Sequence, residues 1–194
     1  MKDGVDRRSR ILTTAGELFA ARGVQTTTVR EIGDAVGVLS GSLYHYFDSK
    51  EEIVLEIVSA FIGELRDRSL SVAASTSEPV SCLRELFAAT TDVLLAHQDA
   101  CLIYQNDATC LNTWPGFRPL ADQMREIHLI WAGVVEDGVE AGHIRVEVDP
   151  SLFAYLAIDS ICDSLNWSRS VDGVGFATVA NICTEVLLSG CLNQ

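Results

Sequence analysis

Apolar residues recur along this chain at every third or fourth position, which is the spacing of one face of an α-helix. Residues 6–22 place Ile11, Ala15 and Phe19 on one face, and Gly23 follows as a stop. The same spacing predicts helices over 28–36, 40–47, 49–68, 79–94, 99–111, 117–141, 150–167 and 176–189. We therefore expect an all-α fold of about nine helices.

Between these helices the pattern breaks. Residues 69–77 are small and polar and predict a loop, and residues 114–116 interrupt the middle of the chain. Residues 144–148 alternate like a strand, but one strand has nothing to pair with. We interpret that segment as an extended connection.

The segment 28–50 predicts a helix-turn-helix. Thr28 with Glu31, and Ser49 with Glu52, have the spacing of capping boxes that open helices. Residues 37–39 join the two short helices, with Gly37 at the sharp turn. The residues expected to face inward are Val29, Ile32, Ala35, Val36, Leu43 and Phe47.

The residues left facing outward are suited to DNA. Hydroxyl, imidazole and phenol groups contact phosphates and base edges, and small residues let the backbone approach the duplex. The candidates on the second helix are Ser40, Gly41, Ser42, Tyr44, His45 and Tyr46. Thr27, Thr28 and Lys50 join them because they lie near helix N-termini, which favour phosphate. The alternative is that the aromatic residues pack under the following helix, above all Tyr46.

Charge alone argues against a DNA-binding protein until it is divided by region. The 194 residues are 48% hydrophobic, which excludes disorder, and they carry a net charge of −13. Residues 1–50 have a net charge of +1 and residues 51–194 a net charge of −14. Because salt screens charges beyond about 8 Å, an acidic body opposes DNA binding at the head only weakly.

Other kinds of chemistry find little support. The six cysteines lie in apolar stretches without a C-x-x-C pair, which indicates buried reduced thiols and a cytoplasmic protein. No signal peptide or membrane span is expected. His97 and Cys101 have metal-ligand spacing but lack a third ligand, so we expect no metal and no cofactor. Asp159 and Asp163 are four residues apart, yet no catalytic motif accompanies them, so we expect no enzyme.

Residues 26–38 and 41–52 resemble the DNA-binding head of TetR-type transcriptional regulators. The resemblance implies a homodimer with a DNA-binding head at 1–50 and an effector-binding and dimerisation domain at 51–194. It also implies a repressor that leaves a pseudo-palindromic operator when a small effector binds. A same-fold activator and an all-α ligand-binding protein without DNA binding are the alternatives.

The recognition helix departs from many relatives, which begin it with Ser-Lys or Ser-Arg where this chain has Leu39-Ser40. We therefore expect Ser40 to be the N-cap and one basic phosphate contact to be missing. Residues 39–45, 103–105 and 166–167 are similar to a subgroup that senses acyl-CoA thioesters from steroid-ring breakdown. Ile158 and Cys162 stand where that subgroup tends to carry a basic and an aromatic residue. The acidic body suits a CoA polyphosphate only if Arg66, Arg68, Arg84, Arg118 or Arg125 gather at the pocket mouth.

Large side chains on the middle helices are the candidates for an apolar or amphipathic effector. They are Tyr104, Trp114, Phe117, Met124, His128, Trp131, Ile158, Cys162 and Trp167. Core packing is the alternative for each, and Trp167 could instead lie in the dimer seam. The last helix is too apolar for a lone surface helix, which predicts pairing with a twofold partner. Its candidate interface residues are Phe176, Val179, Ala180, Cys183, Val186 and Leu187.

Overall fold

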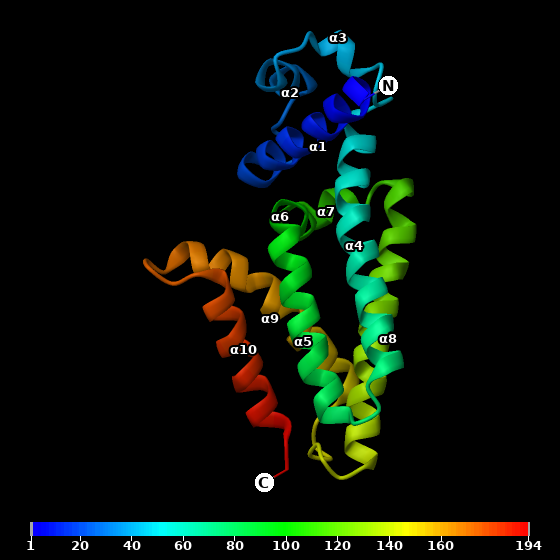
Figure 1. Cartoon of the computed structure of the whole chain (residues 1–194), viewed down its shortest axis with the longest axis vertical. Coiled ribbons are helices and arrows are strands. Elements are labelled where there is room, and N and C mark those ends of the chain that lie inside the picture. The colour runs from blue at the N-terminus through cyan, green and yellow to red at the C-terminus, as the bar shows by residue number, and fades with distance from the viewer. Residues whose placement is uncertain (1, 194) are drawn as a thin grey trace. The chain divides into compact units, whose positions relative to one another are not determined.

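The computed structural model describes the backbone of residues 2–193 and the side chains of residues 7–193. This range contains ten α-helices and one 3-10 turn, and within it no strand forms. Ile144 makes an isolated bridge with Leu192, and Arg145 donates its N–H to the Cys191 carbonyl at 2.9 Å. The predicted all-α fold is confirmed, with one helix more than expected (Figure 1).

The chain divides into two compact units. The first comprises Met1–Phe61 and His97–Leu120, so the N-terminal helices share a unit with a segment from the middle of the chain. Its elements are α1 (Lys2–Arg22), α2 (Val29–Val36), α3 (Ser40–Leu43), the start of α4 (Lys50–Ser75), α6 (Gln98–Asn106), α7 (Ala108–Leu111) and η1 (Pro115–Phe117).

The second unit comprises Ile62–Ala96 and Ala121–Gln194. It holds the rest of α4 and most of α8 (Arg118–Glu140), together with α5 (Pro79–Ala96), α9 (Pro150–Ser170) and α10 (Phe176–Cys191). In Figure 1, α9 (orange) and α10 (red) follow one another and pack together. The core of this unit includes Leu86, Phe87, Trp131 and Ile161, each at most 1% exposed.

Three helix boundaries differ from those predicted. α4 continues to Ser75 through the expected loop, because Ser69 is buried and its hydroxyl donates to the Leu65 carbonyl at 2.8 Å. The helix expected at 99–111 is broken at Asp107 into α6 and α7. α3 ends at Leu43 and not at Phe47, and the residues between form a turn.

Local capping follows the sequence in part. Thr28 and Glu31 form the complete capping box that the pattern predicts. At α4 the Glu52 N–H donates to the Ser49 hydroxyl at 3.1 Å, while the Glu52 carboxylate accepts from the N–H of Asp48, one residue earlier than expected. Two predictions are wrong: Ser40 is the first helical residue, with Leu39 at the N-cap, and Ala35 is exposed and not inward-facing.

All six cysteines are free thiols, four of them buried. Within the described residues no helix is long and apolar enough to cross a membrane. No group of three His, Cys, Asp or Glu residues with metal-site geometry occurs among those residues either.

Candidate nucleic-acid interface and effector site

The turn between α2 and α3 is tight and rests directly on α2. Gly37 adopts the left-handed conformation, with φ of 80°, that a glycine provides at low cost. The Val38 N–H donates to the Gly33 carbonyl at 2.9 Å. A Cβ at position 33 would lie 3.0 Å from the Val38 oxygen and 3.2 Å from the Ser40 Cα. The absence of a side chain at Gly33 therefore allows this close packing.

Buried residues fix α3 from below. Leu43 and Phe47 are 1% and 3% exposed, and Ile32 on α2 is fully buried. The Arg8 guanidinium lies 4.5 Å from the centre of the Phe47 ring and is ion-paired to Glu56 on α4. Hydrogen bonding to Glu56 raises the pKa of Arg8 further, so this cation is permanent. Arg8 of α1 thus connects the segment that follows α3 to α4.

The predicted DNA-contacting residues of α3 lie mostly at the surface. Gly41, Tyr44 and His45 are exposed, while Ser40, Ser42 and Tyr46 are half-buried. The Tyr44 side chain is 56% exposed, so its phenol group is accessible to a partner molecule. Thr28 is exposed as well, although its hydroxyl serves the α2 capping box.

Two predicted DNA contacts have other uses. The Thr27 side chain is fully buried, and its hydroxyl donates to the Gly23 carbonyl at 2.9 Å. The Lys50 ammonium donates to the carbonyls of Val24 and Thr27 at 2.7 and 2.9 Å. Both side chains stabilise the loop between α1 and α2, and their bonds direct them into the fold and not outward.

The same loop is held from a second side. The Val24 N–H donates to both carboxylate oxygens of Asp107, at 3.2 and 3.1 Å. Asp107 is the residue at which α6 ends and α7 begins. Asp107 therefore binds the N–H of Val24, and Lys50 binds its carbonyl. Within the first unit, these bonds connect residues 97–120 to the helix-turn-helix.

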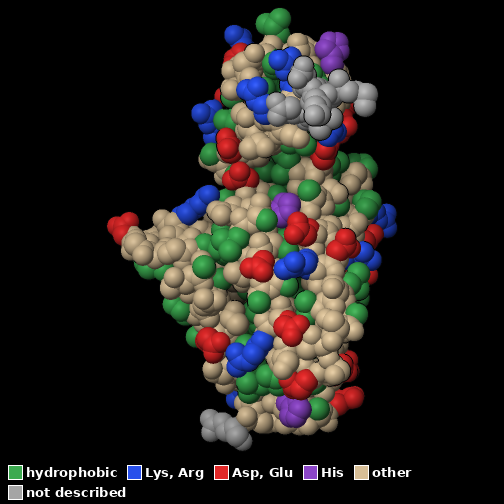
Figure 2. Space-filling model, in the orientation of Figure 1, with side chains coloured by type: hydrophobic (Ala, Val, Ile, Leu, Met, Phe, Trp, Pro, Cys, Tyr) green, Lys and Arg blue, Asp and Glu red, His purple; other side chains and the backbone are tan. Residues whose placement is uncertain are grey.

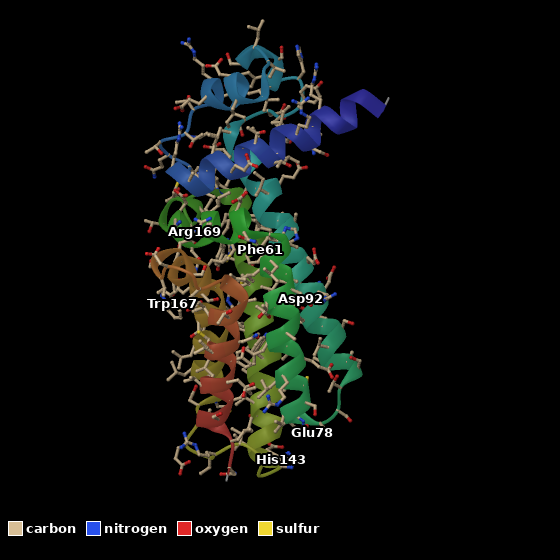
Figure 3. All side chains as sticks on the ribbon, turned by 60° about the vertical axis from the view of Figure 1, so that its left-hand side comes forward. Phe61, Glu78, Asp92, His143, Trp167 and Arg169 are labelled. Atoms are coloured by element: carbon tan, nitrogen blue, oxygen red, sulfur yellow. The ribbon has the colours of Figure 1, made fainter. Side chains whose placement is uncertain are left out.

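The candidate effector residues fall into both units. In the first unit Phe117 is buried, Tyr104 and Trp114 are half-buried, and the Tyr104 ring lies 6.5 Å from that of Phe61 and 6.2 Å from that of Phe117. In the second unit Met124, Trp131, Ile158 and Cys162 are buried. Trp167 is 45% exposed near the end of α9, beside the labelled Arg169 in Figure 3.

Four buried polar atoms on α5 and α8 lack a hydrogen-bond partner in the described part of the chain. They are Thr90 Oγ1, Gln123 Oε1, His128 Nε2 and Trp131 Nε1. His128 Nδ1 contacts the Met124 carbonyl at 2.8 Å, so Nδ1 must carry a proton and Nε2 of the neutral ring is an acceptor. Trp131 packs edge-on against Phe87 at 4.9 Å and presents a donor. Unpaired buried polar groups are costly, so each would gain from a ligand that bonds to it.

A carboxylate flanks His128. The His128 ring lies against the Tyr155 ring, with their centroids 4.2 Å apart. Asp159 follows Tyr155 by one turn of α9. Burial raises the pKa of Asp159, His128 acts in the opposite direction, and Asp163 raises it again. This desolvation is only partial, because the Asp159 side chain is still exposed to solvent; Asp163 is half-buried.

α9 and α10 expose an apolar face that differs in part from the predicted one. Val186 is 66% exposed and Val179, Cys183 and Leu187 are half-buried, whereas Phe176 and Ala180 pack inside the chain. Additional exposed residues on this face are Leu152, Tyr155, Leu156 and Ile182. A groove of about 300 Å³ runs between the two helices, lined among others by Leu152, Leu156 and Val186.

On the face that Figure 2 shows, the acidic residues of the body are scattered over the body helices among a few cations. Most of the arginines considered for a polyphosphate are ion-paired in the second unit: Arg66 with Glu126, Arg68 with Asp92, Arg84 with Glu185 and Arg125 with Asp122. Of that set, only Arg118 makes no ion pair within the described residues.

Comparison with known proteins decides the family. Residues 11–57 match the family described as bacterial regulatory proteins, tetR family, and residues 76–191 match the tetracyclin repressor-like C-terminal domain. The chain belongs to the TetR family. Together the two matches cover most of its length, so it is a DNA-binding transcriptional regulator with the helix-turn-helix described above.

Similar TetR-family proteins carry the name KstR2. The chain is 37% identical over 188 residues to the HTH-type transcriptional repressor KstR2 of Mycobacterium tuberculosis, covering 97% of this chain and 94% of that protein. Identity to KstR2 of Rhodococcus jostii is 36% over 184 residues, 95% of this chain and 90% of that protein. The solved structure of the M. tuberculosis ketosteroid transcriptional regulator KstR2 superimposes with a TM-score of 0.89 at 34% identity, covering 97% and 96% of the two chains.

A more distant TetR-type structure, AibR in complex with isovaleryl coenzyme A and operator DNA, superimposes with a TM-score of 0.81. It covers 94% of this chain and 98% of that chain. At 21% identity this likeness shows the fold alone.

For this TetR-family chain, sequence patterns missed three residues that the structure singles out. Asp107 bonds to a loop 83 positions away, and no local pattern signals such a pair. Arg8 precedes its partner Glu56 by 48 positions. Leu39 differs in the sequence only by departing from the usual start of the recognition helix, whereas the structure adds that its side chain is 82% exposed.

Proposed function

We propose that this TetR-family protein is a cytoplasmic, homodimeric repressor that binds a pseudo-palindromic operator and leaves it when a small effector binds. The observation that carries DNA binding is the exposed α3 surface, held rigidly from below by Leu43 and Phe47. Repression is favoured over activation because the most similar relatives described above are named repressors. The proposed DNA-binding head is residues 1–50 and the proposed body is residues 51–194, although residues 51–61 and 97–120 of that body belong to the same compact unit as the head.

The proposed interface consists of the outward residues of α3 and its neighbours. These are Thr28, Ser40, Gly41, Ser42, Tyr44, His45 and Tyr46. Gel-shift titration of the DNA upstream of the protein's own gene tests it. Tyr44→Ala and His45→Ala should each weaken specific binding by about 1–3 kcal/mol, roughly 5- to 150-fold. Glu140→Ala, at an exposed position outside the interface, should leave it unchanged. Wild-type protein that ignores this DNA at low salt would refute the function.

The exposed apolar face of α9 and α10 supports the proposed dimer. A face of this kind is costly in water and is explained by a second copy of the chain. Val186→Asp should convert the dimer to a monomer in sedimentation velocity. Leu129→Asp is the matched control, because Leu129 is equally exposed at 65% but lies on α8. A dimer that survives Val186→Asp places the interface elsewhere.

The four unpaired buried polar atoms on α5 and α8 support effector binding by the second unit. All four belong to uncharged groups when His128 is neutral, so they suit hydroxyl, keto or amide groups on an apolar skeleton. The ion-paired arginines make a polyphosphate less well matched to this unit. The isovaleryl coenzyme A bound by the fold neighbour AibR nevertheless makes coenzyme A thioesters of apolar acids the first probes, with the free acids beside them. An effector should raise the melting temperature and release the operator, and Trp131→Phe should reduce both effects.

A further inference from the structure

The turn of the helix-turn-helix carries a large apolar side chain in water. Leu39 is 82% exposed, which is the highest value for a large hydrophobic residue in the described part of the chain. A single exposed leucine is ordinary, but this one stands at the N-cap of the recognition helix α3. In helix-turn-helix proteins, the N-terminal residues of this helix face the base edges.

The position of Leu39 is fixed by its backbone and not by packing of its side chain. Its φ and ψ are −64° and 139°, and its carbonyl accepts the Ser42 N–H at 2.8 Å. On the other side, the Val38 N–H donates to Gly33, and the missing side chain at Gly33 keeps the turn pressed onto α2. The leucine side chain is thus presented outward at a defined place, with little conformational freedom of the backbone to lose on binding.

The chemistry at this place is apolar, whereas its neighbours are polar or small. Ser40 and Gly41 follow it and leave space for a duplex, and no charge at position 39 can attract a phosphate. Among the base edges of the major groove, the thymine C5-methyl is the feature that an apolar side chain recognises. A leucine buried against that methyl removes apolar surface from water on both sides.

We propose that Leu39 is a specificity-determining residue that packs against the C5-methyl group of a thymine in each operator half-site. This inference rests on the proposed DNA binding by α3. It assigns direct base recognition to Leu39, next to Ser40, the position at which many relatives carry a lysine or arginine.

The test combines Leu39→Ala with removal of single methyl groups from DNA. The duplex is the footprinted fragment from upstream of the protein's own gene, with each thymine replaced in turn by deoxyuridine. For the wild-type protein, one replacement per half-site should weaken binding about fourfold, the value of one buried methyl. Leu39→Ala changes both subunits and should weaken binding to the unmodified fragment about sixteenfold, roughly fourfold at each half-site, with no further loss at that same thymine.

The controls separate failure of this inference from failure of the proposed function. Val146→Ala removes another exposed apolar side chain, at 79% exposure in the second unit, and should retain the wild-type response to every deoxyuridine. Leu39→Ala should keep the wild-type melting temperature and salt dependence, because it removes neither core packing nor charge. Wild-type protein that binds no upstream fragment refutes the proposed function. Binding in which every methyl deletion and Leu39→Ala act additively, or an equal loss on unrelated DNA, overturns the assignment of Leu39.

Discussion

A lysine at the start of a helix suggests a phosphate ligand, yet Lys50 donates to two carbonyls of its own chain. The sequence indicated correctly that Lys50 is a cation and that it lies near a helix N-terminus. The acceptors are the backbone oxygens of a loop more than 20 residues earlier, and backbone oxygens have no sequence signature. Thr27 differs from its prediction for the same reason, because its hydroxyl bonds to the Gly23 carbonyl.

Replacement of Lys50 separates the two roles. Lys50→Met keeps the aliphatic stem but removes both hydrogen bonds from the ammonium, so the free energy of unfolding should fall by about 1–3 kcal/mol. Urea denaturation measures this loss. The salt dependence of operator binding should keep its slope, since no phosphate contact is lost. A slope that becomes shallower by about one unit per subunit would return Lys50 to the DNA interface.

Glu78 is a second residue whose charge is used locally, at the start of α5. Its carboxylate accepts the N–H groups of Ser81 and Val80 at 2.6 and 3.0 Å, and His143 lies 3.4 Å from it (Figure 3). These interactions, with the side chain and backbone of Ser81 foremost, lower the pKa of Glu78. A carboxylate with a lowered pKa stabilises the fold above its ordinary pKa and loses that effect as the pH falls through the lowered value.

Thermal unfolding at different pH values tests this cap. Glu78→Ala should melt below the wild type at pH 7, and the difference should shrink as the pH falls below about 4. Glu140→Ala is the control, because Glu140 is exposed and forms no hydrogen bond or ion pair within the described residues. A Glu78→Ala difference that stays constant down to pH 3 would mean that the carboxylate charge contributes nothing.

At the scale of elements, local patterns predicted most of the helices correctly. They failed where a hydrogen bond joins residues that are far apart in the sequence. The capping box at Thr28 was predictable because all of its atoms lie within four residues. The break between α6 and α7 was not, because Asp107 turns its carboxylate to Val24, far away in the sequence. α4 extends beyond its predicted end because Ser69 is buried in a tertiary contact. A serine without such a contact favours a loop.

The predictions for the candidate sites also divide into those that a local pattern decides and those that need the surrounding structure. The pattern predicted correctly that Tyr44 and His45 are exposed, although α3 ends at Leu43 and both residues lie in the turn that follows it. It could not separate a pocket wall from a packed core for Met124 or Trp131, because both place apolar side chains inward. The missing hydrogen-bond partner of the Trp131 indole becomes visible only when its neighbours are known.

The contact between α2 and the following turn gives a prediction at this scale. Gly33→Ala adds a Cβ against backbone atoms at 3.0 and 3.2 Å, and backbone cannot rotate away as a side chain does. The free energy of unfolding should fall by about 1–3 kcal/mol, and operator affinity should fall with it because α3 shifts. Gly63→Ala is the matched control, with no atom within 4 Å of its Cβ. It should leave stability unchanged or raise it by about 0.5–1 kcal/mol. Equal behaviour of the two variants in urea would contradict close packing at the turn.

At the scale of the whole molecule, the uneven distribution of charged residues changes the interpretation of the net charge of −13. The body carries the acidic excess and residues 1–50 are nearly neutral, so general attraction to DNA is weak. Binding must then come from specific contacts of two heads at once. A twofold dimer provides this, because it joins two moderate half-site interactions into one strong interaction.

This argument makes a geometric prediction about the operator. A dimer that places its recognition helices on one side of the duplex needs half-site centres about one turn apart, roughly 34–36 Å, or somewhat wider. Inserting five base pairs between the half-sites turns one of them to the opposite side, about half a helical turn away. Affinity in gel-shift titration should then fall to that of a fragment with a single half-site, because only one head can bind at a time. Affinity that is unchanged by the insertion would mean that the heads bind independently, and simultaneous binding of both heads by the proposed dimer would be wrong.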